Sequence, residues 1–172
     1  VLTPITAIVL GIFAFNGITR LKAEYDNLYG FMLIPIMNLD EANIQRANLT
    51  TLIITYNKPG LADGAKSAIK VKISAAEENM SAVIAQYESE WVTTLSPEFS
   101  NTLLSMGREE LQAEETNALE QFHQKYTAYI SIRKDLFAGK SIDSAALEMD
   151  LNAMGSELDK LVEINKSYAE IS

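Results

Sequence analysis

The stretch that decides the fold is residues 39–60, LDEANIQRANLTTLIITYNKPG. Its core-type residues recur at alternating intervals of three and four, which is the spacing of one buried stripe along an α-helix. The stripe consists of Leu39, Ala42, Arg46, Leu49, Ile53 and Tyr56. NKPG at 57–60 should end the helix, because Pro59 cannot continue it and Gly60 favours a turn. Arg46 is the exception in this stripe, since it carries a permanent positive charge.

Three further helices follow from the same spacing. The second is expected from Asp63 or Gly64 to LSPE at 95–98, and the third from Pro97, with Ser96 as its N-cap, to a stop at Gly139. The fourth follows FAGKSIDS at 137–144. The second stripe is Ile69, Ile73, Ala76, Met80, Val83, Tyr87 and Trp91. The third is Leu104, Arg108, Leu111, Glu115, Ala118, Phe122, Tyr126, Tyr129, Arg133 and Leu136, and the fourth is Leu147, Leu151, Met154, Leu158, Leu161, Asn165 and Tyr168.

These stripes predict an all-α fold. Alternation by three and four is typical of left-handed helix bundles, and short loops make neighbouring helices antiparallel. We therefore expect an antiparallel up-down-up-down four-helix bundle with both chain ends at one pole.

Composition narrows the function. The chain has 172 residues, of which 48% are hydrophobic, so it can build one core and is not a disordered chain. Its net charge of −9 argues against a nucleic-acid partner, because phosphate binding needs clustered Lys and Arg. The absence of cysteine excludes disulfides, thiol catalysis and Cys-based metal sites.

The first 19 residues contain no charged side chain, and charges begin at once with Arg20 and Lys22. Their helical length is roughly the thickness of a bilayer's hydrocarbon core. We interpret residues 1–19 as the end of a transmembrane helix that continues into the first soluble helix, and residues 20–172 as an extracytoplasmic domain. The alternative is a buried helix of a soluble protein. The last helix has no stop signal, so a second membrane helix is expected after it.

Several segments resemble the four-helix-bundle sensor domain of bacterial methyl-accepting chemotaxis proteins. They are the Y-x-x-L-Y region at Tyr25–Tyr29, FAGKSIDSAALEMDL at 137–151 and LDKLVEINKSYAE at 158–170. The resemblance covers nearly the whole chain and lies in its architecture and length pattern more than in a signature. It implies a periplasmic, homodimeric ligand sensor in the inner membrane, without a cofactor, whose signal controls a cytoplasmic histidine kinase. In that family, arginines in the membrane-distal half of the bundle bind carboxylate ligands.

Counting from the distal turns places Tyr126 and Thr127 at the level of Arg46, with Arg133 about one to two helical turns above Tyr126. Two guanidiniums at this spacing could hold the two ends of a small dicarboxylate, because the planar fork of arginine binds a carboxylate bidentately. The predicted site also includes the positions Tyr129, Asn43 and Thr50. Asn43 and Thr50 could instead face a partner subunit or simply be solvated.

The charged and polar members of the stripes could also have purely structural roles. Arg46 could pair with an internal carboxylate such as Glu78 or Glu115, or extend to the solvent. Arg108 and Glu115 are interpreted as charges at the boundary of the core. The acidic runs at 75–79 and 108–115 are interpreted as solvated helix faces. Asn165 could fix helix register, as a lone buried Asn does in coiled coils.

An enzymatic function is not expected. Glu120 and His123 have the Glu-x-x-His spacing of di-iron bundles, but such sites need two of these pairs and His123 is the only histidine. Phe122 fits the stripe, so His123 should face outward. Two other functions compete with the chemoreceptor. One is the sensor domain of a histidine kinase or cyclase, and the other is a structural bundle in which the arginines pair with acids.

Overall fold

The computed structural model describes residues 18–19, 22, 33–92 and 97–171. The predicted membrane segment 1–19 lies almost entirely outside these residues, and Tyr25–Tyr29 and Ser96 lie wholly outside them. Within the described ranges, no helix combines the length and the hydropathy needed to cross a bilayer.

The described part of the chain is helical and contains no strand. Its elements are α2 (Ile34–Tyr56), α3 (Asp63–Tyr87), the π-helical turn η2 (Glu88–Val92), α4 (Pro97–Ser105), α5 (Glu110–Phe137) and α6 (Ser144–Ile171). The predicted end of the first helix at Tyr56 and the start of the second at Asp63 are confirmed. Asp143 caps α6, because its Oδ1 accepts hydrogen bonds from the backbone N–H groups of Ala145 (2.9 Å) and Ala146 (3.2 Å).

The third predicted helix is wrong as one continuous element. It consists of the short α4 and the long α5, joined at Gly107 in a left-handed conformation with φ of 63°. The N–H of Arg108 donates to the carbonyl of Leu103 at 2.9 Å, which closes the turn between them. Glycine adopts this conformation without the steric penalty that a Cβ would bring.

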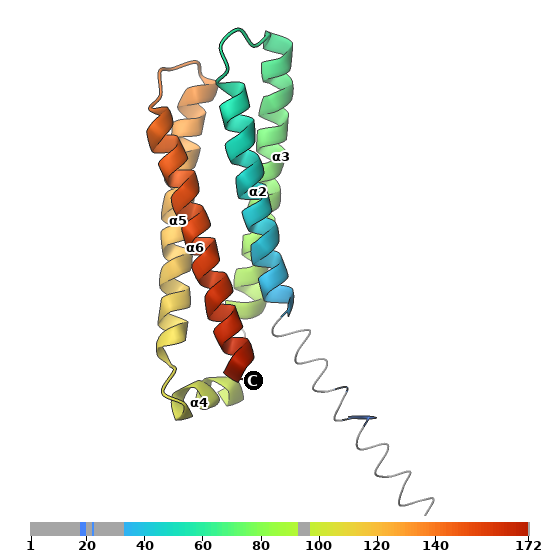
Figure 1. The fold of residues 1–172 in the computed structure, drawn as a ribbon, viewed down its shortest axis with the longest axis vertical. Helices are drawn as coiled ribbons and strands as arrows, with labels where there is room; N and C mark the ends of the chain where they lie inside the picture. Colours follow the sequence, from blue (N-terminus) through green and yellow to red (C-terminus); the bar gives the residue numbers. More distant parts are fainter. Residues whose placement is uncertain (1–17, 20–21, 23–32, 93–96, 172) are drawn as a thin grey trace, which may run out of the picture.

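Figure 1 shows how the four long helices α2, α3, α5 and α6 lie side by side. The α2–α3 and α5–α6 loops lie at one end of the molecule. The start of α2, the end of α6 and the short α4 lie at the other end. Helix α2 packs closely on α3 and α6, and α5 packs closely on α6. Between α3 and α5, long polar side chains make several of the contacts described below.

The core follows the predicted stripes. The buried residues of α2 include Leu39, Ala42, Leu49 and Ile53, and those of α6 include Leu151, Met154, Leu158 and Leu161. Near α4, a smaller cluster contains Leu103, Leu111, Ile164 and Tyr168. The periodicity therefore identifies most of the apolar interior, but it is wrong in α4, where the predicted member Leu104 is 63% exposed and its neighbour Leu103 is buried. The charged members of the stripes also need an explanation.

Candidate functional site

Arg46 lies half-buried on α2, on the side that faces α6. Its Nε donates to Oδ1 of Asn43 at 2.8 Å, and its Nη1 lies 3.4 Å from the carbonyl oxygen of Leu151. Neither Glu78 nor Glu115 is its partner, and Arg46 forms no ion pair with any residue that the structure describes. A guanidinium that has lost part of its water and has no carboxylate in direct contact attracts an anion.

The amide of Asn43 connects Arg46 to α6. Its Oδ1 accepts from Arg46, and its Nδ2 donates to Oδ1 of Asp159 at 3.1 Å. Thr50 takes a different role, since its hydroxyl donates to the backbone carbonyl of Arg46 at 3.2 Å. Of the two residues predicted to flank Arg46, only Asn43 contacts the guanidinium.

Arg133 on α5 is paired with an internal acid. Its Nε and Nη2 lie 2.8 and 2.7 Å from the two carboxylate oxygens of Glu77 on α3. The hydroxyl of Tyr129 donates to the same carboxylate at 2.7 Å. The side chains of Arg133 and Glu77 are only 16% and 8% exposed, so this bidentate pair lies within the core. The positive charge of Arg133 is already compensated by the protein.

The aromatic members of the predicted site lie beside this pair. Tyr129 is buried and stacks on the half-buried Tyr126 with 6.1 Å between ring centroids. Ser81 on α3 donates to the hydroxyl of Tyr126 at 3.0 Å. Burial, and then the charge of Glu77, raise the pKa of Tyr129, so its hydroxyl stays a proton donor. Thr127 is exposed.

The predicted site residues therefore fall into two groups. Arg46, Asn43 and Thr50 lie on α2, where the Arg46 guanidinium and the Asn43 amide are directed to α6, whereas Arg133, Tyr129 and Tyr126 contact α3 from α5. No hydrogen bond or ion pair among the described residues joins the two groups. The clamp of two arginines on one dicarboxylate stays a prediction, and the arrangement leaves only Arg46 without an acidic partner.

Glu115 is a second buried acid. Glu115 on α5 is 3% exposed, so its interpretation as a boundary charge is wrong. Tyr87 on α3 and Tyr168 on α6 each donate a hydroxyl hydrogen bond to its carboxylate. Burial raises the pKa of Glu115, and these two hydrogen bonds lower it in part. Arg108, the other predicted boundary charge, lies in the loop before α5 and pairs with Glu110 at 3.1 Å.

Asn165 completes the cluster around Glu115. It is buried, and its Nδ2 donates to the hydroxyl of Tyr87 at 2.6 Å and to the carbonyl of Leu161 at 2.8 Å. Three helices, α3, α5 and α6, thus meet at Glu115 through hydrogen bonds. The register function predicted for Asn165 agrees with this position but is not tested by it.

Sequence reasoning missed Glu77, because the run at 75–79 was interpreted as a solvated face. Glu78 is exposed as expected, but Glu77 is 6% exposed. A signal was present, since Glu77 follows Ile73 by four residues and precedes Met80 by three, as a stripe member would. Only the structure shows that Arg133 and Tyr129 of α5 donate hydrogen bonds to the Glu77 carboxylate.

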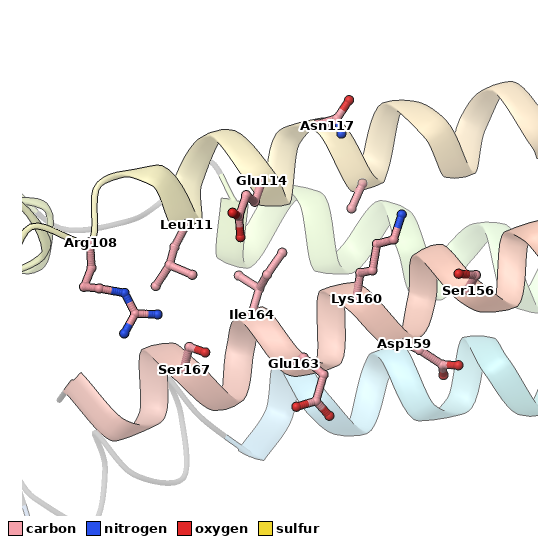
Figure 2. Close-up of a pocket in the computed structure, with 11 residues that line it drawn as sticks. Arg108, Leu111, Glu114, Asn117, Ser156, Asp159, Lys160, Glu163, Ile164 and Ser167 are labelled. Atoms are coloured by element: carbon pink, nitrogen blue, oxygen red, sulfur yellow. The ribbon is translucent and has the colours of Figure 1, made fainter.

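A groove of about 560 Å³ lies between α5 and α6. Figure 2 shows Glu114 and Lys160 reaching into the space between the helices, which Leu111 and Ile164 also line. Lys160 is engaged by Glu157 at 2.8 Å. Asp159 also lines the groove, and its carboxylate accepts the hydrogen bond from Asn43, the residue that contacts Arg46.

Metal ligands do not gather in the described part of the chain, where no group of three or more His, Cys, Asp or Glu is placed to hold an ion. His123 faces outward, as predicted, and its Nε2 lies 2.6 Å from Oε1 of Glu88. Phe122 is buried in its place. The guanidinium of Arg46 still has N–H groups that could donate to an anion.

No protein-family model, curated protein or solved structure matches the chain.

Proposed function

We propose that the chain is the sensor domain of a membrane chemoreceptor and that it binds a small carboxylate-bearing ligand at Arg46. The observation that carries the proposal is the guanidinium of Arg46, which is half-buried and has no acidic partner among the described residues. Charge-assisted hydrogen bonds to a guanidinium are among the strongest that a carboxylate can make. We propose a non-enzymatic, ligand-binding role without a cofactor.

The fold supports a receptor. We assign it as an antiparallel up-down-up-down four-helix bundle, in keeping with the four long helices and the loops at one end in Figure 1. The start of α2 and the end of α6 share the opposite end, as they must if both continue into one membrane. The uncharged residues 1–19 would supply the first of those membrane helices. The domain would then lie in the periplasm or outside the cell.

The ligand that fits this arrangement needs only one carboxylate. Arg133 carries its own carboxylate from Glu77, and displacing that bidentate pair would leave a buried acid behind. Arg46 can offer the N–H groups that are not used by Asn43 and Leu151. Binding therefore depends on Arg46 and leaves the Arg133–Glu77 pair in place.

A homodimer would cover an exposed stripe on α2. Its members begin at Leu33, directly before α2, alternate by four and three residues and are all exposed: Leu33, Met37, Asp40, Ile44, Ala47, Thr51 and Ile54. Met37, Ile44 and Ile54 are 58%, 54% and 53% exposed. Apolar side chains that share one exposed face, unlike those scattered singly, can mark an interaction site. This is the repeat of a two-stranded coiled coil, so α2 of a second copy is the occupant we propose.

Signalling would follow from a displacement between α2 and α6. A ligand can shift the equilibrium between two helix arrangements only if it binds them unequally. Arg46 on α2 reaches a carbonyl of α6, so a ligand held there touches the interface whose geometry would change. Helix shifts of roughly 1–2 Å are a known mode of transmission.

Two alternatives share these features in part. A sensor histidine kinase or a cyclase receptor could carry the same bundle, and the difference would lie in its output module. A structural bundle without a small ligand is favoured by one observation, the compensation of Arg133 by Glu77. A structural bundle does not account for Arg46, which is half-buried and has no acidic partner among the described residues.

A thermal-shift screen of organic acids and amino acids tests the proposal. A ligand that binds only the folded state raises the melting temperature. We expect at least one carboxylate to do so for the wild type and not for Arg46→Ala. The matched control is Gln45→Ala, which removes the neighbouring side chain that bonds to Glu41 and should keep the shift. Equal shifts for the wild type and Arg46→Ala would refute binding at Arg46.

A further inference from the structure

Gly155 lies buried within α6, at the point where the guanidinium of Arg46 meets that helix. A Cβ atom placed on Gly155 would lie 2.8 Å from Nε and 2.9 Å from Cζ of Arg46. Both distances are shorter than real Cβ atoms show, so the guanidinium occupies the space of the missing side chain. Gly64 in the first turn of α3 provides the contrast, because a Cβ there would meet nothing within 4 Å.

Glycine within a helix has a cost, since it lowers helix stability relative to alanine. Gly155 therefore needs a reason, and the three nearest atoms to a Cβ at this position, outside its own helix backbone, all belong to the Arg46 side chain. These atoms belong to the far end of a flexible side chain. An alanine would move the guanidinium rather than the backbone of either helix.

We infer that Gly155 is a positioning residue, which seats the Arg46 guanidinium against the backbone of α6 and so sets the direction in which Arg46 presents its free N–H groups. The seated guanidinium lets Nε reach Asn43 and turns Nη1 to the carbonyl of Leu151, one helical turn before Gly155. We call the contact between Gly155 and the Arg46 guanidinium the seat. The part of this inference that concerns a ligand rests on the proposed function, whereas the seat does not depend on any ligand.

The seat also fixes the register of α2 against α6. The residues one turn away on α6 are Leu151 and Asp159, and both carry side chains. A slide of one turn, about 5.4 Å, would bring one of them to the position of Gly155. The guanidinium could then not lie against the backbone. A ligand that needs the seated Arg46 would favour the register with Gly155 opposite Arg46.

Side-chain NMR of the full chain tests the seat without any ligand. The Nε–H signal of Arg46 in the wild type should exchange with water more slowly than that of Arg108, whose side chain is 40% exposed. Gly155→Ala should accelerate the exchange of Arg46, and Gly64→Ala should not. Circular dichroism should show both variants folded. An Arg46 signal that exchanges as fast as that of Arg108 in the wild type would overturn the inference, and so would one that Gly155→Ala leaves unchanged.

Titration with succinate and acetate separates the two proposals. If either acid binds the wild type, Gly155→Ala should weaken it roughly tenfold or more, the factor expected for losing one charge-assisted hydrogen bond. Gly64→Ala should bind like the wild type. If neither these acids nor any other carboxylate binds while the NMR result holds, the proposed function fails and the seat stands. If an acid binds the wild type and Gly155→Ala equally, the seat does not position the site.

Discussion

The guanidinium of Arg133 lies against the carboxylate of Glu77, with Nε and Nη2 at 2.8 and 2.7 Å from its two oxygens. This pair joins α5 to α3, and Tyr129 adds a third hydrogen bond from α5. Arg46 has no such carboxylate among the described residues. Two arginines that look alike in the sequence therefore have different surroundings, because Arg133 is compensated within the core and Arg46 has no acidic partner among the described residues.

Removal of Glu77 should destabilise the fold. Glu77→Ala leaves the guanidinium of Arg133 with little exposure and no counter-charge, which costs about 3 kcal/mol of unfolding free energy. Glu77→Met combined with Arg133→Met should cost less than Glu77→Ala alone, because neither charge then stays buried. Urea denaturation measures the unfolding free energy of the single and the double variant. The control is Glu78→Ala, an exposed neighbour with an expected effect within about 0.5 kcal/mol. Equal stabilities of Glu77→Ala and Glu78→Ala would contradict the buried pair.

Glu115 should make stability depend on pH. Its folded pKa is raised by burial above the unfolded value of about 4.3, so the folded chain holds the proton more tightly. Its favourable contribution is complete below the unfolded pKa and is lost as the pH rises through the folded pKa. Glu115→Gln stays neutral and can still bond to Tyr87 and Tyr168. The free energy of unfolding of Glu115→Gln minus that of the wild type should therefore increase from pH 4 to pH 7.

The increase should be about 1.4 kcal/mol for each unit by which the folded pKa exceeds the unfolded one. Urea unfolding at a series of pH values gives this difference. Glu114→Gln, a change at the exposed neighbouring residue, should show a smaller dependence on pH. A difference that stays flat or falls with rising pH would show that Glu115 is not held in a site that favours its neutral form.

Gly107 should be sensitive to substitution although it is exposed. Its φ of 63° is unfavourable for a residue with a Cβ, so Gly107→Ala should lower the unfolding free energy by roughly 1 to 2 kcal/mol. Gly64→Ala, within α3, should do the opposite, because alanine favours helix. Thermal unfolding distinguishes the two effects, because Gly107→Ala should lower the melting temperature and Gly64→Ala should raise it. A stabilising Gly107→Ala would mean that α4 and α5 can form the continuous helix that the sequence predicted.

The dimer proposal predicts a single-residue cross-link. Since the chain has no native cysteine, Ile44→Cys places one thiol in the exposed stripe of α2. A symmetric pair of α2 helices would bring two such thiols together, and oxidation should yield a disulfide-linked dimer on a non-reducing gel. Val71→Cys, at a 71% exposed position on α3, is the control and should stay monomeric. Sedimentation should also show Ile44→Asp as a monomer. Equal cross-linking at both positions would argue against this interface.

The sequence predicts the apolar interior well for a physical reason. The positions of Leu39, Leu49 and Ile53 follow from helix periodicity alone, because each helix buries one face. The break at Gly107 does not follow from periodicity, since Leu104, Arg108 and Leu111 keep the spacing across it. One residue with positive φ changes the direction of the chain without changing the residue count.

The candidate site is predicted less completely, because side chains from other helices decide whether a charged residue is buried and whether it has a partner. Arg46 and Arg133 occupy equivalent positions in their stripes, and only packing shows that Glu77 meets one of them. Glu115 looks like a boundary residue until Tyr87 and Tyr168 are seen to donate to it. Gly155 gives no sequence signal at all, since its significance lies in the space that Arg46 occupies.

The most direct test of the central claim is calorimetric titration of the carboxylate that gives the largest thermal shift. We expect it to bind the wild type and the double variant Glu77→Gln/Arg133→Gln with similar affinity. Arg46→Ala should bind roughly 10- to 100-fold more weakly, the loss expected for a hydrogen bond to a charged group. Undiminished affinity in Arg46→Ala would contradict the account, because the guanidinium on α2 would then not be the group that holds the ligand.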